Sequence, residues 1–180
     1  MSTPLKGSRW GILGGRFDPV HFGHLTLAEE ARRMQRLDGV LLVPSHFHPH
    51  KSSQARASYA DRVAMLRLAI TLYDFMEVSE IEASRNLSGY TLDTVRAIKK
   101  QYPETEFSFI IGADNLGQFE KWHQPEEILR EVVLIAGARP NHALSAIDGL
   151  PADRLVLLDS PLVEVSWTQV REMLASATGY

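Results

Sequence analysis

Short, nearly continuous hydrophobic segments recur along the chain and alternate with longer segments of helical periodicity. Strands that are buried on both faces of a sheet produce continuous segments of the first kind. They predict five strands, at Trp10–Leu13, Val40–Val43, Phe107–Ile111, Val132–Ala136 and Leu155–Leu158. The second kind predicts five helices, at Leu25–Leu37, Tyr59–Leu72, Thr91–Gln101, Glu126–Glu131 and Thr168–Ser176.

Alternating strands and helices are typical of an α/β fold in which a doubly wound parallel sheet carries helices on both faces. The length of 180 residues fits a single domain over residues 1–180. Ligands of such sheets bind outside the carboxyl ends of the strands, where the strand order reverses. In the second predicted helix Val63, Leu66 and Ile70 share one face, whereas Arg62 and Arg67 lie elsewhere on that helix.

Composition and charge exclude several classes of function. The formal charge of −3 gives no bulk attraction to nucleic acid or to anionic membranes, so neither partner is expected. The absence of cysteine excludes disulfides, thiol catalysis and cysteine-bound zinc. Residues 1–9 hold no hydrophobic signal core, and the longest hydrophobic run is far below the ~18 residues of a membrane span. We therefore expect a cytoplasmic protein, and its oligomeric state, including a homo-oligomer, is left open.

The segment Gly14–Leu25 joins the first predicted strand to the first predicted helix. Gly14 and Gly15 allow a ligand to approach the main chain closely, and the free N–H groups of a helix start favour anions. His21 and His24 are three residues apart and share one face of that helix. Two imidazoles beside a phosphate-sized hollow suit phosphate chemistry, and the alternative is a tight turn with two surface histidines. The signatures of dinucleotide-binding and phosphate-loop proteins are both absent from this segment.

The run Gly-Gly-Arg-Phe-Asp-Pro-Val-His-Phe-Gly-His resembles the signature of a nucleotidyltransferase superfamily with a Rossmann-like core. Together with four further motifs in matching order, it makes the chain resemble the bacterial nicotinate mononucleotide adenylyltransferases. The resemblance implies that ATP and nicotinate mononucleotide react to give nicotinate adenine dinucleotide and pyrophosphate. His21 and His24 would be catalytic. The implied ATP contacts in this run are Gly14, Gly15, Phe17, His21, Gly23 and His24, and Asp18 would bind the second substrate.

Mg²⁺ is the expected cofactor and would arrive with ATP, held mostly by ATP and water, so no metal site of the protein itself is predicted. The cluster His46, His48 and His50 is the alternative, but two prolines indicate a loop and no carboxylate follows nearby. The family carries a similar loop ending in Pro-His-Lys beside the nucleotide phosphates. The resemblance therefore assigns a catalytic and substrate-binding role to Lys51.

The segment Ser166–Arg171 precedes the last predicted helix and reads as a capping box, with Ser166 as the cap. It also resembles the family motif Ile-Ser-Ser-Thr-x-x-Arg, which binds the triphosphate of ATP. By that match Ser166, Thr168 and Arg171 would bind ATP phosphates, and Arg171 would assist catalysis. A guanidinium pairs with phosphate oxygens through two parallel hydrogen bonds, which suits this role.

The remaining motifs would bind the sugar and the second substrate. Gly112 and Asp114 follow a predicted strand and would contact the ATP ribose, and the alternative for Asp114 is a helix cap. Trp122 would stack on the flat pyridine ring, and the alternative is ordinary packing. In the resembling family, main-chain N–H groups at Tyr90–Thr91 hold the nicotinate carboxylate; the alternative is a plain helix cap. A family arginine near bound phosphate corresponds to Arg139.

Three departures from the family pattern keep other functions open. Arg16 stands where the family usually has threonine, Trp167 replaces a serine, and the chain ends at Tyr180, where the family usually continues. One alternative is a sister adenylyl- or cytidylyltransferase acting on nicotinamide mononucleotide or phosphopantetheine, although the phosphopantetheine enzymes usually have threonine at the position of His21. The other is a nucleotide-binding protein with impaired catalysis.

Overall fold

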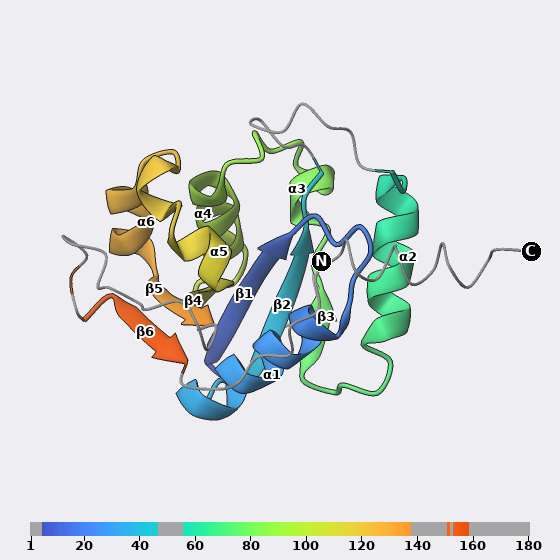
Figure 1. Cartoon of the computed structure of the whole chain (residues 1–180), viewed down its shortest axis with the longest axis horizontal. Coiled ribbons are helices and arrows are strands. Elements are labelled where there is room, and N and C mark those ends of the chain that lie inside the picture. Colours follow the sequence, from blue (N-terminus) through green and yellow to red (C-terminus); the bar gives the residue numbers. More distant parts are fainter. Residues whose placement is uncertain (1–4, 47–55, 138–150, 152, 159–180) are drawn as a thin grey trace, which may run out of the picture.

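The computed structural model describes residues 5–46, 56–137, 151 and 153–158 of the chain. Its centre is a six-stranded sheet in the order β3-β2-β1-β4-β5-β6, and all neighbouring strands are parallel. Figure 1 shows this sheet from β6 at the left to β3 at the right. The strands are β1 (Arg9–Gly15), β2 (Gly39–Pro44), β3 (Met76–Val78), β4 (Glu106–Ile111), β5 (Val133–Gly137) and β6 (Leu155–Leu158). The predicted α/β fold with a doubly wound parallel sheet is confirmed.

The five predicted strands are confirmed, and β3 was missed. Each predicted strand overlaps an observed one, because the continuous hydrophobic segments are buried: every residue of β2, for example, is buried. In contrast, β3 has only three residues and lies at the sheet edge, with an exposed residue at its centre. A strand of that length leaves no hydrophobic pattern to recognise.

Helices connect the strands on both faces of the sheet. They are α1 (Phe22–Gln35), α2 (Tyr59–Ala69), α3 (Ile81–Ser84), α4 (Thr91–Gln101), α5 (Ala113–Leu116), the 3-10 turn η1 (Phe119–Lys121) and α6 (Pro125–Glu131). The short elements α3 and η1 were not predicted. The predicted helix at Leu25–Leu37 ends earlier than expected, because Arg36 adopts the left-handed conformation (φ 51°). The helix predicted at Thr168–Ser176 lies outside the described residues.

Two hydrophobic cores lie on opposite faces of the sheet. One contains residues of α1 and α2, including Ala28 and Leu66. The other contains residues of α3, α4 and α6, including Ile81, Ile98 and Ile128. Figure 1 shows the two groups of helices around the sheet. Burial on both faces explains why the strands read as continuous hydrophobic segments.

Helix α2 confirms part of its predicted pattern and contradicts another part. Val63 and Leu66 are buried, and Ile70 packs against the same core. Arg62 is also buried, with 4% of its surface exposed, whereas Arg67 is exposed. The expectation that Arg62 lies away from the buried face was wrong, because its guanidinium finds carbonyl partners inside the protein.

The strand order reverses between β1 and β4, and we call the region at the carboxyl ends of these two strands the crevice. The chain runs outward from β1 through β2 to β3, then returns to the other side of β1 as β4. The connections that follow β1 and β4 therefore lead to strands on opposite sides, β2 and β5. This is the position at which doubly wound sheets bind ligands. The turn with the two predicted histidines follows β1 directly.

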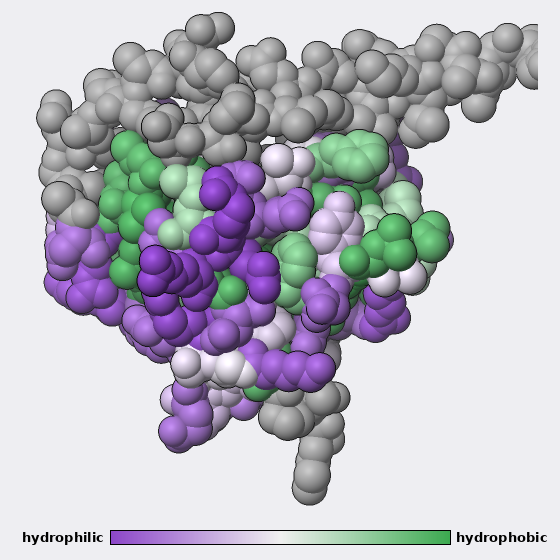
Figure 2. Space-filling model, turned by 90° about the horizontal axis from the view of Figure 1, so that it is seen from below, coloured by the Kyte–Doolittle hydropathy of each residue, from purple (hydrophilic) through white to green (hydrophobic). Residues whose placement is uncertain are grey.

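The surface is mixed in character. On the face in Figure 2, hydrophilic side chains predominate and hydrophobic ones gather in separate patches. Within the described part of the chain, the exposed large hydrophobic side chains are Phe22, Leu68, Leu72 and Leu157. No helix among those residues is long and apolar enough to cross a bilayer.

Candidate active site

The turn between β1 and α1 is shaped around Phe17. This residue has a φ of 49°, a conformation that bulky residues rarely adopt, and only 1% of its surface is exposed. A Cβ on Gly15 would lie 3.2 Å from the Phe17 ring, and one on Gly14 would lie 3.3 Å from the ring of Phe109. The two glycines therefore make room for aromatic rings of the protein itself. Because the Phe17 side chain is buried, the predicted contact between Phe17 and ATP would be made by the main chain of this residue.

Helix α1 begins at the carboxyl end of β1 and presents its positive end there. His21 is the N-cap residue, with extended backbone, and Gly23 lies in the first turn. This first turn, which the structure describes in full, contains no acidic residue that would offset the partial positive charge of the helix start. The last turn carries Arg32 and Arg33, which match the negative end. The start of α1 therefore favours an anion.

The rings of His21 and His24 lie against each other, with centroids 3.8 Å apart and planes inclined by 31°. The main-chain N–H of His21 donates to Nδ1 of His24 over 3.3 Å. Since a neutral imidazole has one donor and one acceptor nitrogen, Nε2 of His24 carries the hydrogen. The edge of the Phe17 ring supports His24 from another side, 4.9 Å between centroids. The predicted pair of histidines is thus brought together and oriented.

Both histidines are neutral at neutral pH. Burial, and then repulsion from His21 once it is protonated, lower the pKa of His24 from 6.5 to about 3. Burial also lowers the pKa of His21. A neutral imidazole at a helix start can donate one hydrogen bond from Nε2 without adding a positive charge to the site. The pair is suited to stabilising charge that develops on a phosphate oxygen.

The start of α4 lies near the carboxyl end of β2 and carries Tyr90 and Thr91, the N-cap and first residue of the helix. One turn further on, the hydroxyl of Thr94 donates to Glu82 over 2.8 Å. Glu82 also accepts the N–H of His46, which follows β2, over 3.0 Å. These two bonds bring the predicted nicotinate-binding segment to the same edge of the sheet as the histidine pair.

Trp122 is connected to the same edge through Phe109 on β4. Its ring meets that of Phe109 edge-on, with centroids 6.2 Å apart, and lies 5.4 Å from that of Phe119. Phe109 is also the neighbour of Gly14. The neighbouring His123 stacks on Tyr90 at 4.3 Å. Sequence reasoning missed His123, because a lone histidine after a tryptophan carries no recognisable signal. The stacking of Trp122 on the pyridine ring of the substrate stays a prediction.

Gly112 directly follows β4 and is the N-cap of α5, so the alternative interpretation of Asp114 as the cap was wrong. A Cβ on Gly112 would have no atom within 4 Å, in contrast with the crowded Gly14 and Gly15. The main chain at Gly112 is therefore open to a ligand. Contacts of Gly112 and of the Asp114 side chain with a ribose stay predictions.

Asp18 is nearly buried, and its carboxylate accepts main-chain N–H groups of Arg56 and Ala57 over 2.8 and 3.3 Å. It thus connects the turn after β1 with the start of α2. This contact could not be read from the sequence, because the partners are 38 and 39 residues away. The predicted contact of Asp18 with the second substrate stays a prediction.

Five predicted site residues, Lys51, Arg139, Ser166, Thr168 and Arg171, lie outside the described residues, as do His48 and His50 of the alternative metal cluster. Within the described ranges, no group of three or more histidine, aspartate or glutamate side chains is arranged to hold a metal ion. Sequence reasoning also missed two buried charged residues, Arg62 and Glu82. Their spacing matches no motif. The partners of Arg62 are main-chain carbonyls, and those of Glu82 are the main-chain N–H of His46 and the hydroxyl of Thr94.

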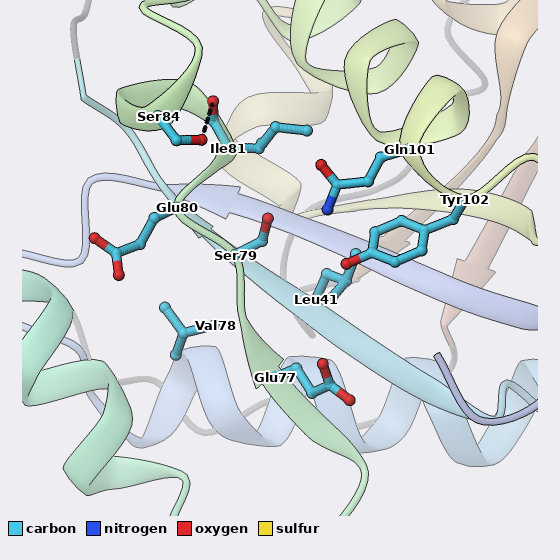
Figure 3. A pocket seen from close by; sticks show the side chains of 9 residues that line it. All are labelled: Leu41, Glu77, Val78, Ser79, Glu80, Ile81, Ser84, Gln101 and Tyr102. Atoms are coloured by element: carbon cyan, nitrogen blue, oxygen red, sulfur yellow. Dashed lines mark hydrogen bonds between the residues drawn. The ribbon is translucent and has the colours of Figure 1, made fainter. Parts of the chain in front are cut away.

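A separate hollow lies between the edge strand β3 and the end of α4 (Figure 3). Its lining includes Glu77, Ser79, Gln101 and Tyr102, and Figure 3 shows these polar side chains around it. No residue predicted for catalysis or for nucleotide binding lines it. The candidate active site is therefore the crevice around the start of α1.

Comparison with known proteins shows which family this chain resembles. A family model described as cytidylyltransferase-like matches residues 12–177. A protein of Exiguobacterium sibiricum named "Probable nicotinate-nucleotide adenylyltransferase" is 41% identical over 92% of this chain and 85% of its own length. One of the same name from Opitutus terrae is 40% identical over 90% and 83%. The solved "Plasmodium falciparum nicotinic acid mononucleotide adenylyltransferase complexed with NaAD" has a TM-score of 0.77 at 20% identity, over 93% of this chain and 84% of that chain, and supports the fold.

Proposed function

The chain belongs to the cytidylyltransferase-like family and to its nicotinate-nucleotide adenylyltransferases, and we propose that it transfers the adenylyl group of ATP to nicotinate mononucleotide. The products are nicotinate adenine dinucleotide and pyrophosphate. The observation that carries this proposal is the oriented, neutral pair of His21 and His24 at the positive start of α1.

The reaction is a direct displacement at phosphorus. A phosphate oxygen of the mononucleotide forms a bond to the α-phosphorus of ATP, and the bond from that phosphorus to the oxygen bridging to the β-phosphate breaks. The second pKa of a phosphate monoester is about 6, so the attacking group is largely a dianion at neutral pH. The chain then needs no protein nucleophile, in agreement with its lack of cysteine. Its task is to align the substrates and stabilise charge.

Each described part of the crevice has one role in this scheme. Nε2–H of His24 donates to an α-phosphate oxygen as charge accumulates, and the start of α1 with His21 holds the ATP phosphates. Gly112 admits the ribose. The start of α4 at Tyr90 and Thr91 receives the nicotinate carboxylate, whose negative charge the helix end favours.

The leaving pyrophosphate is held by Lys51, Ser166, Thr168 and Arg171. The mononucleotide is bound with the help of Asp18 and Arg139. Mg²⁺ enters as part of the ATP substrate, coordinated by phosphate oxygens and water. The substrates are small molecules, in keeping with the modest negative charge of the chain. A cytoplasmic location agrees with substrates of this kind.

The proposal is tested by pyrophosphate release from ATP in the presence of nicotinate mononucleotide, nicotinamide mononucleotide or phosphopantetheine, with CTP replacing ATP in parallel reactions. We expect release that requires ATP and is fastest with nicotinate mononucleotide. Turnover with another phosphorylated substrate or with CTP would assign the chain to a sister activity. Binding of ATP without any release would instead assign it a nucleotide-binding role.

A further inference from the structure

One peptide group after β2 is held from both sides of the sheet. The carbonyl of Ser45 accepts a hydrogen bond from Nη2 of Arg62 over 2.9 Å. The N–H of His46, the other half of the same peptide group, donates to Oε2 of Glu82 over 3.0 Å. Arg62 belongs to α2 on one face, and Glu82 belongs to α3 on the other. We call Arg62, Glu82 and this peptide group the peptide clamp.

Arg62 also connects the peptide clamp to the turn that carries the histidines. Its other terminal nitrogen, Nη1, donates to the carbonyl of Arg16 over 2.6 Å. The next residue, Phe17, is the one whose ring supports His24. One guanidinium therefore spans the turn after β1 and the segment after β2, using the planar fork that distinguishes arginine from lysine.

Glu82 connects the peptide clamp to α4. Its second oxygen accepts the hydroxyl of Thr94 over 2.8 Å, one turn into α4. The start of this helix carries Tyr90 and Thr91. A continuous path of hydrogen bonds thus runs from the turn after β1, through Arg62 and Glu82, to the helix whose start is proposed to bind the mononucleotide.

Burial of these charges needs a reason other than stability. Arg62 is 4% exposed and Glu82 is 7% exposed, and charged side chains are rarely buried to this extent. Burial lowers the pKa of Arg62 and raises that of Glu82, so both charges are held against a cost of desolvation. Buried ionic groups of this kind are often no more stabilising than apolar residues of the same size. What they provide here is defined geometry at the carboxyl ends of β1 and β2.

We propose that Arg62 and Glu82 are positioning residues for adenylyl transfer, which set the separation between the ATP-binding turn and the mononucleotide-binding start of α4. The inference rests on the proposed function. Because neither side chain needs to touch a substrate, their loss should lower kcat more than it weakens binding. Because both act on one peptide group, their effects should be coupled.

The test measures kcat, both KM values and the melting temperature for Arg62→Met, Glu82→Leu and the double variant, with Arg62→Lys and Glu82→Gln as conservative variants. The matched controls are Arg67→Met and Glu80→Gln, which break an exposed ion pair on the same two segments. We expect kcat to fall about tenfold to a hundredfold in Arg62→Met and Glu82→Leu, with smaller changes in KM. The double variant should lose little more than the worse single variant.

Glu82→Gln should retain most activity, because its amide oxygen can accept the His46 N–H while Thr94 accepts from the amide nitrogen. Arg62→Lys should show a several-fold lower kcat at a nearly unchanged melting temperature. If Arg62→Met does not fold, the kcat of Arg62→Lys tests the role of Arg62. Wild-type kcat in folded Arg62 variants, or additive losses in the double variant, would overturn the inference while the proposed function stands. No turnover by the wild-type chain would overturn the proposed function and this inference together.

Discussion

The main-chain N–H of His21 donates to Nδ1 of His24 over 3.3 Å, and this bond determines which nitrogen of His24 carries hydrogen. The acceptor role of Nδ1 leaves Nε2 as the donor. The same contact joins the N-cap of α1 to the third residue of the helix, so formation of the helix start also orients the ring of His24. A local sequence pattern of two histidines three residues apart thus becomes a directed donor.

The first prediction separates the two nitrogens of His24. In His24→Asn, the amide oxygen can still accept the N–H of His21, but the donor that Nε2 supplied is lost. We expect kcat to fall about 10²–10³-fold, the typical effect of removing one donor from developing charge. Steady-state pyrophosphate release measures this loss, and circular dichroism verifies that the variant is folded.

The control for this prediction is His24→Ala, which loses both functions of the ring. It should show a similar loss in kcat and, in addition, about 1 kcal/mol lower stability from the missing contact at the helix start. Turnover close to that of the wild type in folded His24→Asn would remove Nε2 from the chemistry.

The second prediction concerns stability at acidic pH. The pKa of His24 is about 3 in the folded chain against 6.5 as its ordinary value, so between these values the unfolded chain binds more protons. Stability from this residue is therefore complete above pH 6.5 and declines as the pH falls toward 3. Between about pH 7.5 and about pH 5 the loss due to His24 should be about 2 kcal/mol.

Urea unfolding of the wild type and of His24→Asn at both pH values measures this difference. The variant should lose less stability than the wild type over the same range, because asparagine does not titrate. Equal losses in the two proteins would show that His24 titrates normally in the folded state and is not held neutral.

The third prediction uses the contrast between Gly112 and Gly14. A Cβ on Gly112 meets nothing within 4 Å, and the backbone there has an ordinary φ of −75°. Gly112→Ala should therefore leave stability within about 0.5 kcal/mol of the wild type while raising KM for ATP, because the methyl group occupies the space proposed for the ribose. Thermal unfolding and initial rates at varied ATP concentration measure the two effects.

Gly14→Ala serves as the comparison for this prediction. Its Cβ would lie 3.3 Å from the Phe109 ring, so the substitution should lower stability as well as activity. If KM for ATP stayed unchanged in Gly112→Ala, the open face of Gly112 would not be part of the ATP site.

The fourth prediction concerns Trp122. Stacking of a flat heterocycle on an aromatic side chain contributes about 1–3 kcal/mol, so Trp122→Ala should raise KM for nicotinate mononucleotide roughly tenfold or more. KM for ATP should change much less. Since Trp122 also packs against Phe109 and Phe119, the melting temperature must be recorded with the kinetics.

Trp122→Phe keeps an aromatic ring and should restore most of the affinity for the mononucleotide. An unchanged KM for the mononucleotide in folded Trp122→Ala would instead leave Trp122 a packing residue only.

The sequence predicted the parts of the fold whose cause is local. Continuous hydrophobic segments identified five of the six strands, and the glycines followed by two spaced histidines identified the turn and helix start. It could not predict β3, since Met76–Val78 is short and its edge position depends on the neighbouring strand β2. Hydrophobic pattern alone decides neither length nor pairing of such a strand.

Long-range polar contacts were the other part that the sequence could not predict. Arg62 reads as one more charged residue on a helix, and its burial depends on carbonyls that lie 46 and 17 residues away. Glu82 likewise depends on His46, 36 residues earlier. A periodicity argument assigns charged residues to solvent by default, so it fails where the main chain supplies the partners.

The central claim is that this crevice lets the phosphate of nicotinate mononucleotide displace pyrophosphate directly from the α-phosphorus of ATP. It is tested most directly with ATP radiolabelled at the α-phosphate, by separating the products and examining the protein after denaturation. The account predicts that the label appears in nicotinate adenine dinucleotide in step with pyrophosphate release, with none on the protein. Label that remains in ATP, accumulates as AMP or stays bound to the denatured chain would contradict it.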